Sequence, residues 1–201
     1  MEADEFLRKP HTDAVLEKRT VRAMRSAGSR ERERTLEDEA CQDYLTGLLN
    51  RRGLESAVNA LDGKDMPLAV YLFDLDNLKY INDTFGHVRG DLTISAFAKL
   101  LRAQTRESDI LSRLGGDEFV VIMKQMKSGE SAVRKGEDIC RSIREYPFAD
   151  KVQACCSAGV VTWDTREPLS AILEHADQAL YRAKAEKKGG CCLWGDGHEY
   201  P

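Results

Sequence analysis

No stretch of the sequence is apolar for long enough to cross a bilayer, because the longest apolar run covers only residues 68–73. The first five residues, Met-Glu-Ala-Asp-Glu, lack the basic and apolar segments of a signal peptide. Charge of one sign is not in large excess, since 30 basic and 34 acidic residues give a formal net charge of −4. Nothing in this composition favours nucleic acid or an anionic membrane as a partner. We expect a cytoplasmic protein, or the cytoplasmic part of a larger membrane-bound protein.

Cysteine occurs six times, but never with the C-x-x-C spacing that is typical of zinc sites. We expect the cysteines to be reduced and to serve as small hydrophobic residues. The sequence also contains no internal repeat and no low-complexity tract. A zinc-binding protein therefore has little support.

At 201 residues the chain has the length of one domain plus an extension. Residues 1–40 carry dense arginine and glutamate clusters and no sustained heptad pattern. This segment is predicted to be a charged helical linker, either a solvated tail or a stalk that joins the domain to an upstream sensor or a partner chain. Residues 41–195 are predicted to form the domain, and residues 196–201 a C-terminal tail.

From residue 36 onward, helical and strand patterns alternate along the sequence. Helices are predicted over residues 36–41, 50–60, 77–84, 88–105, 129–145 and 169–187, and strands over residues 68–73, both sides of a hairpin within 110–123, 152–163 and 191–194. Gly47 is expected to end the first helix and Asn50 to begin the second. The order, roughly βααββαβ, predicts an α/β sandwich of the α+β kind, with helices packed on a mixed, mostly antiparallel sheet.

The centre of the sequence is residues 113–119, Arg-Leu-Gly-Gly-Asp-Glu-Phe, with β-prone apolar residues on both sides. Glycine accepts the positive φ that a two-residue turn demands, so this segment predicts a hairpin. Asp117 and Glu118 follow the glycines at once. Because successive strand residues point to opposite faces, one of the two acids would serve a site while the other braces it. An ordinary surface hairpin is the alternative.

A second acidic stretch begins where the apolar run ends, at Asp74. A carboxylate there stands where a buried strand reaches the surface, and open sheets tend to bind ligands at such places. Asp74 and Asp117 could both supply oxygen ligands to Mg²⁺ if their strands are neighbours. A helix that starts at Asn77 would offer backbone amides to a phosphate, and Lys79 adds a positive charge. The alternative for Asp74 is a helix cap, although Asp76 is the more natural capping residue.

Together these motifs resemble the GGDEF family of diguanylate cyclases over about residues 43–194. Besides the two acidic stretches, the similar segments are residues 43–52, 86–91, 157–160 and 176–184, in the family's order. The resemblance implies a ferredoxin-like, nucleotidyl-cyclase-type fold preceded by a helical linker. It also implies a bacterial signalling enzyme, a nucleotidyltransferase that condenses two GTP into cyclic di-GMP with release of two pyrophosphates.

The resemblance assigns roles to individual residues. Asp74, Asp117 and the backbone carbonyl of Leu75 would bind Mg²⁺ or Mn²⁺, and the implied catalytic residues are Asp117 and Glu118. Glu118 would assist at the metal or help to deprotonate the 3′-hydroxyl. The implied GTP-binding residues are Asn77, Leu78 and Lys79 for the β- and γ-phosphates, Lys184 and Lys188 for phosphates from the closing helix, and Asn82 and Asp91 for the guanine edge.

The same resemblance bears on the choice of base and on regulation. At two positions this sequence also departs from the family's usual pattern. A carboxylate at Asp91 can accept from guanine N1–H and N2–H₂ together, and adenine offers no such pair, which argues for GTP. Arg106 and Asp109 have the spacing and placement of the family's product-inhibition site. Leu78 stands where the family usually has phenylalanine, and Lys188 where it usually has arginine. Lys188 is therefore either a weaker phosphate ligand or only a cation at a helix C-terminus.

The resemblance implies a homodimer as the active form, because one domain holds one GTP and each 3′-hydroxyl must reach the other nucleotide. Cyclic di-GMP bound at Arg106 and Asp109 would lock two domains apart, which is allosteric inhibition. One alternative is a catalytically silent regulatory module that binds GTP or cyclic di-GMP. Another is a structural or signalling domain whose N-terminal helix carries the function.

Overall fold

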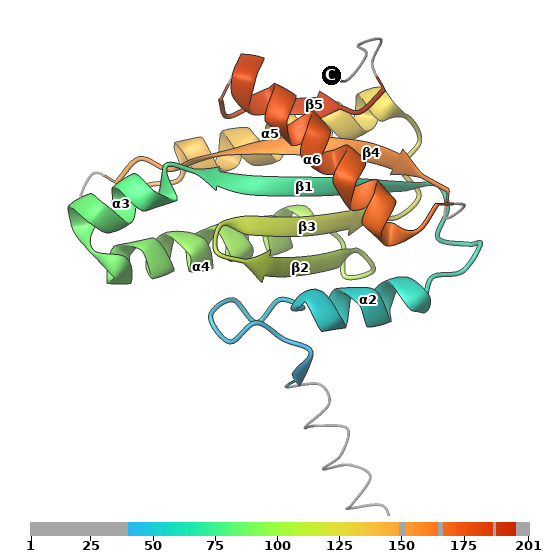
Figure 1. Cartoon of the computed structure of the whole chain (residues 1–201), viewed down its shortest axis with the longest axis horizontal. Helices are drawn as coiled ribbons and strands as arrows, with labels where there is room; N and C mark the ends of the chain where they lie inside the picture. Colours follow the sequence, from blue (N-terminus) through green and yellow to red (C-terminus); the bar gives the residue numbers. More distant parts are fainter. Residues whose placement is uncertain (1–39, 149–151, 165–166, 187, 196–201) are drawn as a thin grey trace, which may run out of the picture. The chain divides into compact units, whose positions relative to one another are not determined.

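The computed structural model describes residues 40–148, 152–164, 167–186 and 188–195 (Figure 1). The predicted linker and tail, and nearly all of the helix predicted over residues 36–41, lie outside the described residues. The elements are α2 (Arg51–Asn59), β1 (Leu68–Asp76), α3 (Leu78–Phe85), α4 (His87–Gln104), β2 (Ile110–Gly115), β3 (Glu118–Met123), α5 (Gly129–Glu145), β4 (Cys155–Trp163), α6 (Leu169–Glu186) and β5 (Cys191–Leu193). Within the described ranges, no helix is long and apolar enough to span a membrane.

Five strands form one sheet in the order β2-β3-β1-β4-β5. All neighbouring pairs are antiparallel except β4 and β5, which are parallel. The sheet is therefore mixed and mostly antiparallel, and the predicted fold class is confirmed. The hairpin predicted around residues 113–119 is also confirmed as the β2–β3 connection.

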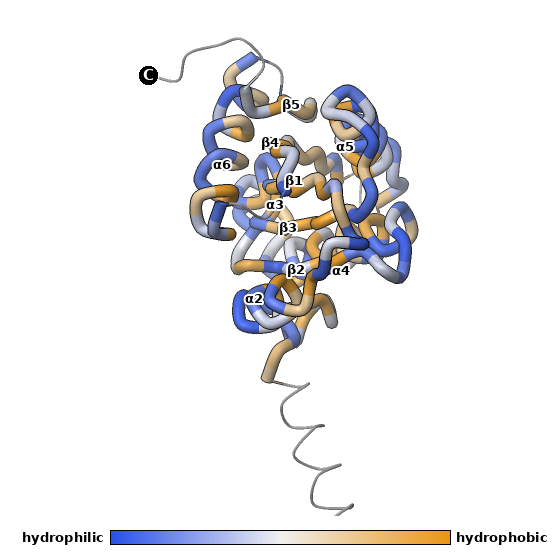
Figure 2. The backbone as a smooth tube through the Cα atoms, turned by 90° about the vertical axis from the view of Figure 1, so that its right-hand side faces the viewer, coloured by the Kyte–Doolittle hydropathy of each residue, from blue (hydrophilic) through white to orange (hydrophobic). Residues whose placement is uncertain are grey.

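The central strand β1 buries both of its faces, as its continuous apolar run predicts. Tyr71 and Phe73 point into the core that α4 and α5 cover. Val70 and Leu72 point into a second core, which α2 and α6 cover. Figures 1 and 2 show this arrangement, with α6 on one face of the sheet and α4 and α5 on the other. The alternation of strand side chains thus builds two hydrophobic layers around one sheet.

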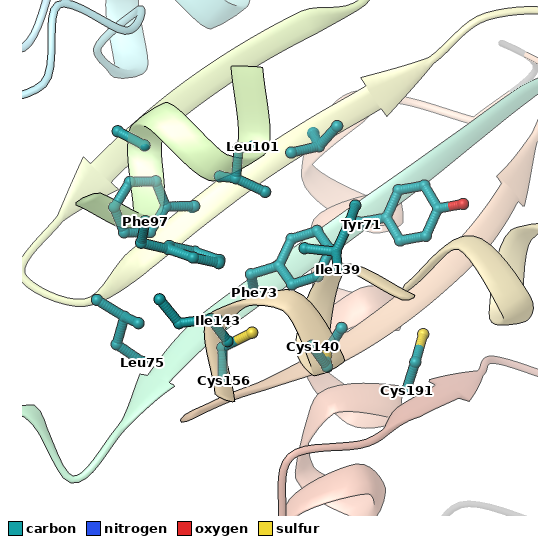
Figure 3. Packing of buried hydrophobic residues seen from close by; sticks show 14 of the residues in the cluster. Tyr71, Phe73, Leu75, Phe97, Leu101, Ile139, Cys140, Ile143, Cys156 and Cys191 are labelled. Carbon is teal, nitrogen blue, oxygen red and sulfur yellow. The ribbon is translucent and has the colours of Figure 1, made fainter. Parts of the chain in front are cut away.

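Aromatic packing ties α4 to the two strands that carry the acidic residues. Phe97 of α4 packs edge-on against Phe73 of β1, with ring centroids 5.9 Å apart (Figure 3). It also packs edge-on against Phe119 of β3, with ring centroids 4.9 Å apart. All three rings are fully buried. Such pairs add about 0.5–1.5 kcal/mol beyond the area they bury. They hold the ends of β1 and β3 in a fixed relation to each other.

A glycine sets the approach of α6 to the sheet. A Cβ atom on Gly159 of β4 would lie 2.0 Å from the carbonyl oxygen of Ala176 and 2.4 Å from the amide nitrogen of Leu180. Both of these are backbone atoms of α6, so they cannot move aside alone. Only glycine lets α6 lie this close to β4, and α6 carries one of the predicted site lysines.

The predicted role of Asp76 as a helix cap is wrong. The N-cap of α3 is Asn77, which has φ 65° and makes no side-chain capping bond. The buried Asp76 carboxylate accepts a hydrogen bond of 2.8 Å from the Ser157 hydroxyl of β4 instead. Strand β1 also runs two residues beyond Asp74, because its pairing with β4 continues to Asp76 opposite Cys155.

The first turn of the described chain differs from its prediction as well. Gly47 has φ 66° and donates its amide to the Asp43 carbonyl at 2.8 Å, so it closes a turn rather than a helix. Asn50 begins α2 as predicted, since its side chain accepts a 3.0 Å hydrogen bond from the amide of Gly53.

Candidate active site

The two acidic stretches meet at one end of the sheet. β1 pairs with β3, Asp74 lies opposite Glu118, and the amide of Leu75 donates to the Asp117 carbonyl at 3.1 Å. Asp117 belongs to the hairpin turn after Gly116, which has φ 54°, and Glu118 opens β3. The strands that carry Asp74 and Asp117 are therefore neighbours, which is the condition for a shared cation site.

Negative charge accumulates around Glu118. Its burial raises the pKa of this carboxyl, and the carboxylates of Asp117, Asp74 and Asp177 raise it further. The guanidinium of Arg51 acts in the opposite direction. Three carboxylates that act on Glu118 in this way favour a bound cation nearby, because a cation would relieve their repulsion with Glu118.

A lysine from α6 reaches into this cluster. The ammonium of Lys184 lies 2.7 Å from a carboxylate oxygen of Asp74, and the two side chains are 34% and 14% exposed. Asp177 comes from the same helix, seven residues earlier, which is about two helical turns along the same face. Sequence reasoning missed Asp177, although its spacing from Lys184 within one motif was the available signal.

The carboxylates fit a hard divalent cation. Mg²⁺ usually takes one or two protein carboxylates and completes its shell with water and substrate phosphates. Asp74 and Asp117 offer two such carboxylates, and the ammonium of Lys184 is already drawn to the first. Across the described ranges, no group of three or more His, Cys, Asp or Glu side chains forms a ready metal cage.

Backbone amides lie next to the carboxylates. The first amides of a helix have no acceptor within it, and in α3 these include the amides of Asn77, Leu78 and Lys79. The Asn77 side chain makes no capping bond to them. Lys188, which follows α6, lines the same surface hollow as Asn77. The structure thus brings the predicted phosphate residues to the end of the sheet that carries the acids.

The Asn82 side chain of α3 packs against α4 at Gly90, the residue before Asp91. The side-chain oxygen of Asn82 is buried and has no hydrogen-bond partner in the described part of the chain. It packs against Gly90, where a Cβ atom would lie only 1.9 Å away. Asp91 is the next residue along α4 and is exposed. A buried acceptor without a donor, beside an exposed carboxylate, suits a ligand that brings hydrogen-bond donors.

The family described as "Diguanylate cyclase, GGDEF domain" matches residues 40–190, which is most of the chain. This chain belongs to the GGDEF family. The diguanylate cyclase DgcP of Pseudomonas aeruginosa is 40% identical over 161 residues, which cover 74% of this chain and 24% of DgcP. The diguanylate cyclase DgcZ of Escherichia coli is 33% identical over 154 residues, which cover 74% of this chain and 52% of DgcZ. The chain thus spans between a quarter and a half of the length of these relatives.

Solved structures agree with this assignment. One is the crystal structure of the coiled coil and GGDEF domain of DgcB from Caulobacter crescentus in complex with c-di-GMP. It superposes with a TM-score of 0.76 at 23% identity, and the match covers 90% of this chain and 98% of that one. At that identity the likeness concerns the fold alone. A TpbB structure from Pseudomonas aeruginosa that comprises only the GGDEF domain gives a TM-score of 0.67 at 34% identity, covering 76% of this chain and 94% of that one.

A second candidate site of this GGDEF domain lies at the other end of β2. Asp109 accepts hydrogen bonds from the amides of Arg106, at 2.9 Å, and Lys124, at 3.1 Å. Both predicted product-site residues line a hollow of about 370 Å³, together with Lys124, Lys127 and Lys135. The hollow is strongly cationic, and the structure does bring Arg106 and Asp109 together.

Sequence reasoning missed the ion pair that holds the signature hairpin. The guanidinium of Arg113 lies 3.1 Å from both carboxylate oxygens of Asp43, and it donates to the Gly116 carbonyl in the turn at 3.1 and 2.8 Å. Burial alone would raise the pKa of Asp43, but the hydrogen bonds from Thr46 and Arg113 outweigh it and hold that pKa below its ordinary value. The family motif that contains Asp43 is thereby bound to the turn that contains Asp117.

Proposed function

We propose that this GGDEF domain is a diguanylate cyclase, which condenses two GTP into cyclic di-GMP and releases two pyrophosphates. The observation that carries the proposal is the meeting of Asp74, Asp117 and Glu118 at one end of the sheet, next to Lys184 and the start of α3. The relatives DgcP and DgcZ, both named diguanylate cyclases, support it. GTP consumption of this kind is expected in the cytoplasm.

In the proposed reaction each 3′-hydroxyl oxygen bonds to the α-phosphorus of the other GTP, pyrophosphate leaves, and the hydroxyl proton must be accepted. Glu118 is suited to accept this proton, since its raised pKa makes it a stronger base than an ordinary glutamate. Asp74, Asp117 and the Leu75 carbonyl would hold Mg²⁺ or Mn²⁺, which when bound neutralises phosphate charge and lowers the pKa of the attacking hydroxyl.

The phosphates would lie at the start of α3. The amides of Asn77 and Leu78 would bind the β- and γ-phosphates, with the charge of Lys79 beside them. Lys184 would turn from Asp74 toward the phosphates, and Lys188 would approach them from the end of α6. This grouping supports a triphosphate rather than a monophosphate as the ligand.

Guanine would lie between α3 and α4. The unpartnered oxygen of Asn82 needs a hydrogen-bond donor, and guanine offers its N2 amino group. Asp91 can accept from N1–H and N2–H₂ together, a pair of donors that adenine lacks. The two residues together would select GTP over ATP.

The active form would be a homodimer, with two domains face to face about a two-fold axis. Residues 1–40 would be the linker or stalk that brings two chains, or an upstream sensor, into register, ahead of a catalytic domain over residues 41–195 and a tail over residues 196–201. The rate per mole of protein should rise with protein concentration. A rate per mole that stays constant down to high dilution would contradict the dimer.

The hollow at Arg106 and Asp109 would bind the product. Its lysines and arginine suit the two phosphates of cyclic di-GMP, and Arg106 can grip a phosphate or a guanine edge with two donors. Arg106→Ala should relieve inhibition by added cyclic di-GMP and leave the initial rate intact. Unchanged inhibition in that variant would refute the product site.

The decisive experiment incubates the purified chain with GTP and Mg²⁺ and separates the nucleotides by liquid chromatography, with Asp117→Ala as the control. Cyclic di-GMP from the parent, and none from the variant, would establish the activity and its acidic site together. The second candidate function, a cyclic di-GMP receptor, is favoured by the cationic hollow alone. It would be supported by tight binding of cyclic di-GMP to a parent chain that forms no product.

A further inference from the structure

A surface hollow next to the proposed phosphate site is positively charged. It measures about 590 Å³ and is lined by residues from the start of α3, the end of α5, the start of β4 and the segment after α6. Two cations line it, Arg144 and Lys188, and its lining contains no carboxylate. The N-cap residue Asn77 lines it too, so the hollow adjoins the start of α3.

Arg144 holds the segment that carries Lys188. Its guanidinium donates to the carbonyl of Gly189, the residue after Lys188. The Gly189 amide donates in turn to the Ser157 hydroxyl at 3.0 Å, and that hydroxyl donates to Asp76 at the end of β1. The segment after α6 is thus fastened between α5 and the strand that leads into the acidic site.

The positive charges of Arg144 and Lys188 both affect the same thiol, that of Cys155. Arg144 and Lys188 both oppose the increase that burial and Asp76 cause in the pKa of the Cys155 thiol, which lines the hollow. Neither cation forms an ion pair within the described ranges, and both side chains are exposed. One guanidinium N–H group is used at Gly189, which leaves most of its five donors for a ligand. Asp76, the acid that acts on the Cys155 thiol, already accepts from Ser157.

We propose that Arg144 is a further phosphate-binding residue, which together with Lys188 holds the terminal phosphates of GTP and then the leaving pyrophosphate. This inference rests on the proposed function and deepens it. A lysine is a point charge, whereas arginine is a planar fork that can bind two phosphate oxygens at once. Arg144 therefore supplies from α5 the fork that the lysine at position 188 lacks.

The test compares the affinities for GTP, GDP and GMP, measured by calorimetry on the 201-residue chain in the presence of Mg²⁺. Arg144→Ala should weaken GTP binding about tenfold, the size expected for a charged hydrogen bond, and leave GMP binding unchanged. Arg144→Lys should recover only part of the loss. Lys188→Arg in the Arg144→Ala background should restore GTP affinity. The matched control is Arg141→Ala, one turn earlier on α5 and exposed.

A purely structural role would give a different pattern. If Arg144 only fastened Gly189, its loss would weaken GTP and GMP alike and Lys188→Arg would not rescue it, which would overturn the proposal. Arg144→Ala that behaves like Arg141→Ala, in a chain that makes cyclic di-GMP, would overturn it and leave the cyclase standing. A chain that makes no cyclic di-GMP, yet loses its preference for GTP over GMP in Arg144→Ala, would support the phosphate site and refute the cyclase.

Discussion

The ammonium of Lys184 lies 2.7 Å from the carboxylate of Asp74, so the two groups proposed to bind phosphate and metal neutralise each other. The ammonium occupies one of the two Asp74 oxygens that a metal ion would use. A cation at Asp74 would displace the lysine, and the displaced lysine would be free to turn to a phosphate. Metal and nucleotide are therefore expected to bind together more readily than either binds alone.

Lys184→Ala should separate these two effects. Without the competing ammonium, Mn²⁺ should bind more tightly in the absence of nucleotide, while GTP binding weakens about tenfold because a charged phosphate contact is lost. Mn²⁺ binding can be followed by electron paramagnetic resonance without any catalysis. Lys99→Ala on the exposed side of α4 is the control. Weaker Mn²⁺ binding in Lys184→Ala would contradict the exchange.

Glu118 should make stability depend on pH in a definite direction. Its raised pKa means that the folded chain holds this proton more tightly than the unfolded chain does. The free energy of unfolding should therefore fall as the pH rises from the ordinary glutamate pKa through the raised one. Glu118→Gln has no such ionisation and should unfold at a higher temperature than the parent at neutral pH, while its cyclase activity falls about a hundredfold or more.

Thermal unfolding across a pH series measures this effect. Below the ordinary glutamate pKa the Glu118→Gln variant and the parent should unfold at about the same temperature. Glu107→Gln, on an exposed residue, controls for the loss of one charge. A Glu118→Gln variant that is less stable than the parent at neutral pH would show that the carboxylate is stabilised in the fold, contrary to its cluster of acidic neighbours.

The Asp43–Arg113 pair should be a large single contribution to stability. Arg113→Met leaves a largely buried carboxylate without its partner, which costs about 3 kcal/mol of the free energy of unfolding. The pKa of Asp43 is lowered by its bonds to Thr46 and Arg113, so this stabilisation is present above the ordinary aspartate pKa and is lost as the pH falls through the lowered one.

Urea unfolding at neutral and acidic pH tests the pair. The double variant Asp43→Asn with Arg113→Met should lose less stability than the sum of the two single variants, because the second change removes the orphaned charge. Strictly additive losses would mean that the two side chains are not coupled. Each single variant should also reduce activity, since Arg113 holds the turn that carries Asp117.

Gly90→Ala should damage guanine binding while the fold survives. A methyl group there would lie 1.9 Å from the side-chain oxygen of Asn82, and the end of that side chain can move aside. The displaced amide would no longer meet the base, so we expect about a tenfold loss of GTP affinity and a smaller preference for GTP over ATP. Gly63→Ala, which meets no atom within 4 Å, is the control. Unchanged base preference in Gly90→Ala would exclude Asn82 from base recognition.

Local sequence patterns determined the secondary structure, the central buried strand and the signature hairpin. These depend on side-chain alternation and on glycines that adopt positive φ, and such effects act over a few residues. The wrong predictions also came from local patterns. Asp76 was predicted to cap the helix that follows it, but its partner is Ser157, 81 residues later in the chain. No local pattern can indicate that pairing.

Tertiary structure alone decided how the site is assembled. The pairing of β1 with β3 brings Asp74 beside Asp117, and the close approach of α6 at Gly159 brings Lys184 and Asp177 to the same place. Sequence motifs named most of these residues, but the charges they feel depend on distances in space. Long-range contacts set those distances, and Arg144, which belongs to no motif, acquires its proposed role only from its neighbours in the fold.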